Sequence, residues 1–170
     1  GCSSVADYSA RVVSFLAEKR VYQVVLVGHS LGGAIALQLA LDFPGLVDRI
    51  AVLSSAARCP LPARLLEAMK GQPGEAVDVL VGLTLGAAAS GPPAEATRRL
   101  LNEVPTETFR ADFAACARFD ARRRLPHLRV PTLVVGCQQD AMIAVEESHR
   151  LAGLIPGATW VWKTLDNAIF

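Results

Sequence analysis

Residues 24–33 read Val-Val-Leu-Val-Gly-His-Ser-Leu-Gly-Gly, and this stretch decides the fold. Four apolar residues, typical of a buried strand, lead directly into a Gly-x-Ser-x-Gly turn. A segment rich in small and apolar residues, Leu31–Asp42, follows and ends just before Pro44. Gly33 at its start would let a helix lie close to the sheet. The order strand, turn, helix predicts a nucleophile elbow, a sharp turn that exposes a serine at the end of a buried sheet.

The chemistry of this turn identifies Ser30 as the candidate nucleophile. Such a serine has a strained backbone, which costs about 1–3 kcal/mol. We expect Gly28 and Gly32 to be needed because a Cβ atom at either position would collide within the tight turn. The backbone N–H of Leu31 is the candidate oxyanion donor, supported by the positive end of the helix dipole. The alternative for this motif is an ordinary tight turn between a strand and a helix.

Composition limits the classes of function. The chain has 170 residues, 52% hydrophobic and 19% charged, which predicts one ordered domain with a substantial core. The net charge of +1 gives no electrostatic reason to expect nucleic acid or an anionic membrane surface as a partner. The longest apolar stretch, residues 77–89, is too short and too rich in glycine to span a bilayer. We therefore expect a small-molecule substrate, no nucleic acid and no membrane.

The four cysteines, Cys2, Cys59, Cys116 and Cys137, are widely scattered without the spacing of metal ligands. This pattern predicts reduced, mostly buried thiols in a cytoplasmic protein. No signal peptide is visible, although four cysteines could also pair in an oxidising compartment. We expect neither a metal nor a cofactor.

The remaining pattern predicts an α/β fold with about four parallel strands flanked by helices. The expected strands are Gln23–Val27, Ile50–Ser54, 131–136 and Thr159–Lys163, and the expected flanking helices are Tyr8–Glu18, Leu31–Asp42 and Val145–Leu154. Residues 57–128 carry no strand pattern, and four helices are expected there, at 61–70, 75–88, 94–103 and 106–119. This divides the chain into a core of residues 1–56 and 129–170 and a helical insert of residues 57–128.

Two segments together resemble the α/β-hydrolase family. They are the turn at residues 28–33 and the stretch Val-Pro-Thr-Leu-Val-Val-Gly-Cys-Gln-Gln-Asp at residues 130–140. The likeness runs from Asp7 to Thr159 and is greatest to small serine esterases and carbon–carbon hydrolases with a helical lid. It implies that Ser30 is the nucleophile, that Asp140 is the catalytic acid, and that residues 57–128 form the lid. From its position alone, Asp140 could instead be a helix cap.

The sequence departs from the family at both ends. The family's histidine base would fall near Asn167 or Ala168, where this sequence has no histidine. The family's strands before the elbow, with the loop that supplies the second oxyanion donor, have no counterpart. Strand Gln23–Val27 is therefore expected at an open sheet edge, which favours a homo-oligomer, a dimer for example, or coverage by another segment.

None of the three histidines is expected to replace the missing base. His29 lies beside the nucleophile but should point away from it, and His149 falls within the expected helix Val145–Leu154. His127 precedes a strand and should lie at the end of that strand far from Ser30. We interpret all three as structural.

These observations give two hypotheses. The first is a serine hydrolase acting on a small ester, thioester or similar acyl compound. Since losing a member of a catalytic triad typically lowers turnover by about 10⁴–10⁶-fold, the isolated chain is expected to be weak or inactive. A serine in the turn argues against the dehalogenase-like and epoxide-hydrolase-like branches, whose members resemble this family but place an aspartate there. The second hypothesis is a non-catalytic binding or assembly module of the same descent.

Overall fold

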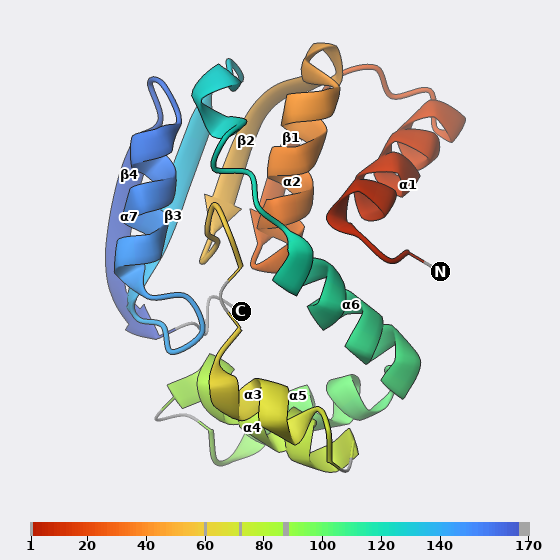
Figure 1. The fold of residues 1–170 in the computed structure, drawn as a ribbon, viewed down its shortest axis with the longest axis vertical. Helices are drawn as coiled ribbons and strands as arrows, with labels where there is room; N and C mark the ends of the chain where they lie inside the picture. The colour runs from red at the N-terminus through yellow and green to blue at the C-terminus, as the bar shows by residue number, and fades with distance from the viewer. Residues whose placement is uncertain (1, 60, 72, 87–88, 167–170) are drawn as a thin grey trace.

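A computed structural model describes residues 2–59, 61–71, 73–86 and 89–166 of the chain (Figure 1). Its centre is a parallel sheet with strand order β1-β2-β3-β4. The strands are β1 (Val24–His29), β2 (Val47–Leu53), β3 (Thr132–Gln139) and β4 (Thr159–Asp166). The predicted α/β class with four parallel strands is confirmed.

The helices fall into two groups. Around the sheet are α1 (Val5–Glu18), α2 (Leu31–Asp42) and α7 (Val145–Leu154), with the short 3-10 turns η1 (Pro44–Leu46) and η3 (Leu125–His127). Between β2 and β3 come α3 (Ala63–Ala68), α4 (Pro73–Leu85), α5 (Pro92–Asn102) and α6 (Thr106–Arg118). The second group and the segments that link its helices make up residues 57–128, which are called the helical insert. It lies beyond the carboxyl ends of the strands (Figure 1).

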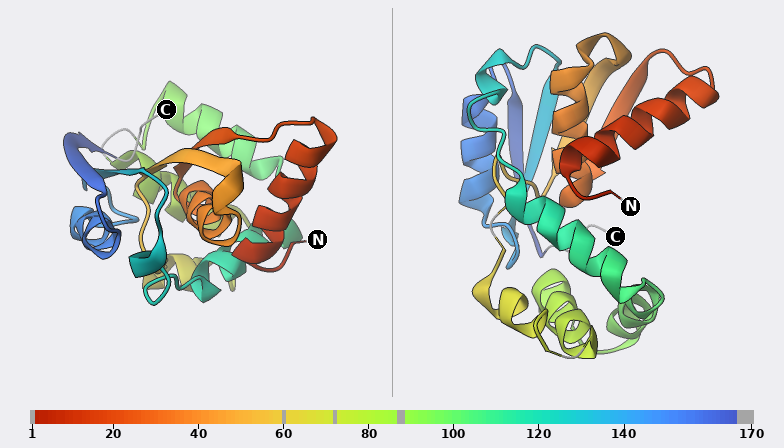
Figure 2. Two further views of the ribbon diagram at one scale, coloured as in Figure 1. Left: turned by 90° about the horizontal axis from the view of Figure 1, so that it is seen from above. Right: turned by 45° about the vertical axis from the view of Figure 1, so that its right-hand side comes forward.

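The strand order explains why the helices cover one face of the sheet. Connections between parallel strands are almost always right-handed. When the strands follow one another in sequence order, each such connection places its helix on the same side. Accordingly α2 packs on β1 and β2 while α7 packs on β3 and β4, and both lie on one side of the sheet (Figure 2).

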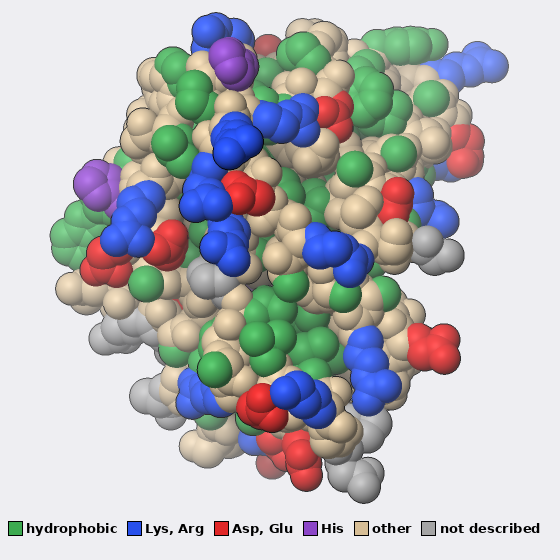
Figure 3. Space-filling model, viewed as in Figure 1, with side chains coloured by type: hydrophobic (Ala, Val, Ile, Leu, Met, Phe, Trp, Pro, Cys, Tyr) green, Lys and Arg blue, Asp and Glu red, His purple; other side chains and the backbone are tan. Residues whose placement is uncertain are grey.

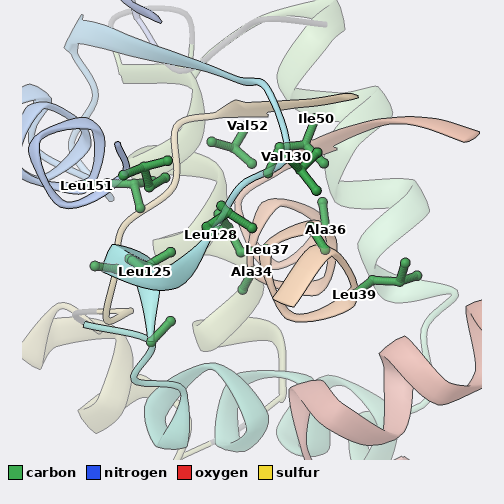
Figure 4. Packing of buried hydrophobic residues seen from close by; sticks show 14 of the residues in the cluster. Ala34, Ala36, Leu37, Leu39, Ile50, Val52, Leu125, Leu128, Val130 and Leu151 are labelled. Carbon is green, nitrogen blue, oxygen red and sulfur yellow. The ribbon is translucent and has the colours of Figure 1, made fainter. Parts of the chain in front are cut away.

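The hydrophobic core fills the space between these helices and the sheet. Leu37 of α2, Val52 of β2, Val134 of β3 and Leu151 of α7 are fully buried there. Leu128, just after η3, belongs to the same cluster as Leu37 (Figure 4). Burial of this apolar surface, at about 25 cal/mol per Å², holds the layers together.

The opposite face of the sheet is open. Val25 and Val27 of β1 are 59% and 72% exposed, and Val161 of β4 is 39% exposed. Parallel sheets in globular proteins are normally covered on both faces. The open face therefore marks a surface that another segment or chain would be expected to cover.

Two chain segments, residues 57–59 and 116–121, connect the insert to the sheet and are called the neck. They pair with each other: Ala121 N–H donates to Ala57 O at 2.8 Å, and Arg58 forms an antiparallel bridge with Asp120. The insert is also tied to α1, because Tyr8 Oη donates to the Asp112 carboxylate on α6. That bond raises the pKa of Tyr8 to about 12.

Candidate active site

Ser30 lies between the end of β1 and the start of α2, half-buried, with φ 51° and ψ −116°. This conformation is unfavourable for any residue with a side chain and persists only where neighbours enforce it. Ser30 N–H donates to Leu53 O at 3.0 Å, which fixes the turn to β2. Gly33 N–H and Ala34 N–H both donate to Ser30 O, which fixes it to α2. The first amide of α2, on Leu31, has no acceptor within the helix and is the expected oxyanion donor.

The glycines around Ser30 have different roles. A Cβ on Gly28 would lie 2.3 Å from Gly32 O, so only glycine fits at that point of the turn. A Cβ on Gly33 would lie 2.0 Å from the hydroxyl oxygen of Ser55, which donates to Ser30 O at 3.0 Å. Gly32 has nothing within 4 Å of its Cβ position. The expectation that Gly32 prevents a collision is therefore wrong, because its α-carbon faces open space.

Asp140 follows β3 directly and is 8% exposed. Its Oδ1 accepts from the N–H groups of Met142 and Ile143, both at 2.8 Å. Helix α7 has Ala144 as its N-cap residue, so Asp140 orders the preceding turn rather than capping the helix. Burial raises the pKa of Asp140 above its usual value. The amides of Ile143 and Met142, the side chain of Ser54 and the charge of His29 each lower it and so partly offset the effect of burial.

Ser54 is a site residue that the sequence did not reveal. It directly follows β2, is fully buried, and has φ 44°, so a second serine with a positive φ lies near Asp140. Ser54 Oγ and Asp140 Oδ2 are both buried without an assigned hydrogen-bond partner among the described residues. The Ser54 side chain nevertheless lowers the pKa of Asp140, which places the two groups close together. The available signal was a polar Ser-Ser pair directly after an apolar strand.

The topology brings Ser30 and Asp140 to the same end of the sheet, where the parallel strands have their carboxyl ends. They follow β1 and β3, which both flank β2. Ser54, at the end of β2, lies between them in strand order.

The histidines occupy three different surroundings. His29 ends β1 and is near enough to Asp140 to lower the pKa of that carboxyl group. His127 lies in η3, before β3, and so at the opposite edge of the sheet from Ser30. His149 is on α7 with its ring centroid 4.5 Å from that of Trp160. The expected base position near Ala168 lies outside the described residues.

Across the described ranges, His, Cys, Asp and Glu side chains do not gather in any group of three or more that could hold a metal ion. In the same part of the chain, no helix has the length and apolar character needed to cross a membrane.

A parallel sheet, a strained serine between strand and helix, and a buried carboxylate after a nearby strand define an α/β protein with the geometry of a nucleophile elbow. The sequence profile of the "Alpha/beta hydrolase family" matches residues 1–167. The chain belongs to the alpha/beta hydrolase family.

Individual relatives agree with this assignment. A protein named as a carbamate hydrolase, RutD of Variovorax paradoxus, is 33% identical over 88% of this chain and 60% of its own length. A crystal structure of a hydrolase from Pseudomonas aeruginosa matches 98% of this chain and 66% of that chain with a TM-score of 0.88 and 23% identity, a likeness of fold. A thermophilic esterase is 29% identical, with a TM-score of 0.82 over 99% of this chain and 66% of that chain. The chain thus spans about two thirds or less of the length of these relatives.

Proposed function

We propose that this chain carries the nucleophile and the acid of a serine hydrolase that acts on a small ester, thioester or similar acyl compound. The observation that carries the proposal is the forced backbone of Ser30 at the carboxyl ends of the strands, together with the buried Asp140 after β3, whose Oδ2 has no assigned hydrogen-bond partner among the described residues. Strain of this kind is concentrated at functional sites. The names of RutD and of the thermophilic esterase support an acyl substrate.

Each residue has a distinct role in this reaction. Ser30 Oγ attacks the carbonyl carbon of the substrate, and the Leu31 N–H donates to the oxygen that becomes negative. Asp140 Oδ2, which has no assigned partner among the described residues, would accept from an imidazole N–H, while Oδ1 is held by two backbone amides. Residues 57–128 act as the lid, since they lie over the edge of the sheet where Ser30 and Asp140 are found (Figure 1).

The base is the missing part of this machinery. His127 and His149 lie away from Ser30, and His29 contributes to the environment of Asp140 instead. A serine hydroxyl without a base is a weak nucleophile. The isolated chain is therefore expected to turn over esters about 10⁴–10⁶-fold more slowly than a complete triad would.

Two experiments test the proposal. A fluorophosphonate probe should label Ser30 of the native chain slowly, because the base is missing, and the Ser30→Ala variant should show no labelling at this peptide by mass spectrometry. The Ala168→His variant should hydrolyse p-nitrophenyl acetate faster than the parent, and Ser30→Ala in that background should remove the gain. Absence of native labelling together with no gain from Ala168→His would instead support a non-catalytic binding or assembly module.

A further inference from the structure

Two of the four cysteines meet at the neck of the helical insert. Cys59 precedes α3 and Cys116 lies in the last turn of α6, so they belong to the two segments that connect the insert with the sheet. Both thiols are free, and each perturbs the pKa of the other, so the two lie close together. The backbone next to them is paired, since Ala121 N–H donates to Ala57 O and Arg58 forms an antiparallel bridge with Asp120. The fold has therefore placed two free thiols near each other across the neck.

One of these thiols can be reached from outside. Cys59 is half-buried and lines an open cavity of about 820 Å³ between the neck and α7. Cys116 is 6% exposed and does not line this cavity. This arrangement, an accessible thiol backed by a buried one, is suited to a reaction that starts at Cys59 and is completed by Cys116.

The cavity carries an excess of positive charge. Arg58, Arg122 and Arg150 line it, together with one carboxylate, Glu147. Arg122 pairs with Asp120, and Arg150 pairs with Glu147. Lys and Arg side chains gather on the face that shows η3, α7 and the end of α6, with a few acidic groups among them (Figure 3). A cavity of this kind favours an anionic ligand.

Exposure assigns the roles of the two thiols. Cys59 lines the cavity, whereas Cys116 is buried. In agreement, Cys116 lowers the pKa of Cys59, while Cys59, burial and the nearby negative charge of Asp112 raise the pKa of Cys116. Since the thiolate is the reactive form, Cys59 is the attacking sulfur and Cys116 is the resolving one.

We infer that Cys59 and Cys116 form a redox-active pair that exchanges with an anionic low-molecular-weight disulfide in the arginine-lined cavity. The Cys59 thiolate attacks one sulfur of the reagent, forms a mixed disulfide, and releases one thiolate that takes up a proton. Cys116 then gives up its proton, attacks the sulfur of Cys59, and releases the second thiol of the reagent. The chain loses two electrons and two protons, and the reagent is reduced to two thiols.

The product is a disulfide that joins the two neck segments. It would fix the insert to the sheet by a covalent link and restrict the unfolded chain. The inference does not depend on hydrolase activity, because it uses none of the residues assigned to that reaction.

Oxidised glutathione, an anionic disulfide, provides the first test. The Cys116→Ser variant should accumulate a mixed disulfide, seen as one glutathionyl group on Cys59 by mass spectrometry. The parent chain should instead lose two hydrogens and give a linked Cys59–Cys116 peptide in a non-reducing digest, with a thermal midpoint several degrees above that of the reduced chain. Cys137→Ser, at a buried position on β3, should behave as the parent does, and Cys59→Ser should give neither product.

Cystamine, a disulfide with positive ends, provides the second test. It should react with Cys59 at least ten-fold more slowly than oxidised glutathione, and Arg58→Glu should reduce that difference. Equal rates for the two reagents, glutathionylation of Cys2 with Cys59 unmodified, or a parent chain that keeps a mixed disulfide without linking to Cys116 would each overturn the inference. If circular dichroism shows that Cys116→Ser does not fold, the peptide map of the parent decides the outcome.

Discussion

At the scale of single residues, backbone strain is concentrated at the carboxyl edge of the sheet. Ser30 and Ser54 directly follow the neighbouring strands β1 and β2 and have φ 51° and 44°, and a third non-glycine residue with positive φ among the described residues, Arg20, lies in the turn after α1. Each such residue costs about 1–3 kcal/mol. Ser30 and Ser54 together therefore lower the stability of the fold appreciably, at the end of the sheet where the candidate site lies.

The glycines of the turn provide a matched pair of substitutions. Gly28→Ala should lower the free energy of unfolding by about 3 kcal/mol, the upper part of the range for overpacking, because the new Cβ meets backbone atoms of Gly32 and Gly33. Gly32→Ala should stay within about 1 kcal/mol of the parent, since its Cβ meets nothing and alanine favours the helix. Urea denaturation followed by circular dichroism measures both. Equal losses for the two variants would show that the turn is not packed as described.

Asp140 predicts an unusual pH dependence of stability. Because burial raises its pKa in the folded state, the folded chain binds this proton more tightly than the unfolded chain does. Its contribution therefore makes the free energy of unfolding fall as pH rises from about 3.9, the ordinary aspartate pKa, through the folded value. Asp140→Asn keeps an acceptor for the Met142 and Ile143 amides but cannot ionise. This variant should be more stable than the parent at pH 7, because it avoids the cost of burying a charged carboxylate. Each kcal/mol of that cost corresponds to about 2–4 °C in Tm. The difference between the variant and the parent should shrink below pH 4.

Asp120 provides a control of opposite sign for that experiment. Its hydrogen bonds with Arg122 lower its pKa to about 2, so its contribution is present above the ordinary aspartate pKa and is lost as pH falls through about 2. Asp120→Asn should thus be slightly less stable than the parent at pH 7, by a small amount because the pair is at the surface. Calorimetry at pH 4 and pH 7 compares both variants with the parent. A lower Tm for Asp140→Asn at pH 7 would contradict the account of Asp140.

The sequence predicted the residues whose role is local and missed those whose role depends on neighbouring strands. The Ser30 turn is a contiguous motif between a strand and a helix, so its place could be predicted from adjacent residues. Ser54 and Gly32 could not be assigned correctly, because one depends on Asp140, which is remote in sequence, and the other on free space around its α-carbon. The catalytic roles of Ser30, Leu31 and Asp140 remain predictions.

At the scale of elements, the bounds were most accurate where local signals mark both ends. Helices α2 and α7 begin and end at the predicted residues, because the tight turn at Ser30 and Phe43-Pro44 delimit the first and Pro156 follows the second. Strand β2 begins at Val47, three residues before its predicted start, and includes the exposed Asp48 and Arg49. Charged residues at the start of a strand conceal it from a search for apolar runs.

Strand β1 is the element whose environment is incomplete. It pairs with β2 on one side, and its other side is the edge of the sheet in the described chain. Hydrogen exchange at low protein concentration should show fast exchange for those amides of β1 that point away from β2. The amides of β2, which lies between β1 and β3, should exchange slowly and serve as the internal reference. Slow exchange of every β1 amide in a dilute monomer would contradict an open edge.

At the scale of the whole molecule, the open face of the sheet and its open edge are adjoining surfaces. Val25 and Val27 contribute to both, because they lie on the edge strand and are 59% and 72% exposed. The sequential strand order places α2 and α7 on one side of the sheet, so neither helix covers the other side.

A chain with an adjoining apolar face and free strand edge should associate with itself, and this association should depend on β1. We expect light scattering to show a mass that increases with concentration, and the double variant Val25→Lys and Val27→Lys to shift the chain to monomer. Leu100→Lys is the matched control: Leu100 is 64% exposed on α5, so the change adds charge to an exposed apolar site far from the sheet and should leave association unchanged. Lysines on the edge strand oppose pairing because two copies would bring like charges together, whereas lysine on α5 would act only through net charge. A parent that is monomeric at every concentration, or a Leu100→Lys variant that dissociates as fully as the β1 variant, would show that this edge is not where copies of the chain meet.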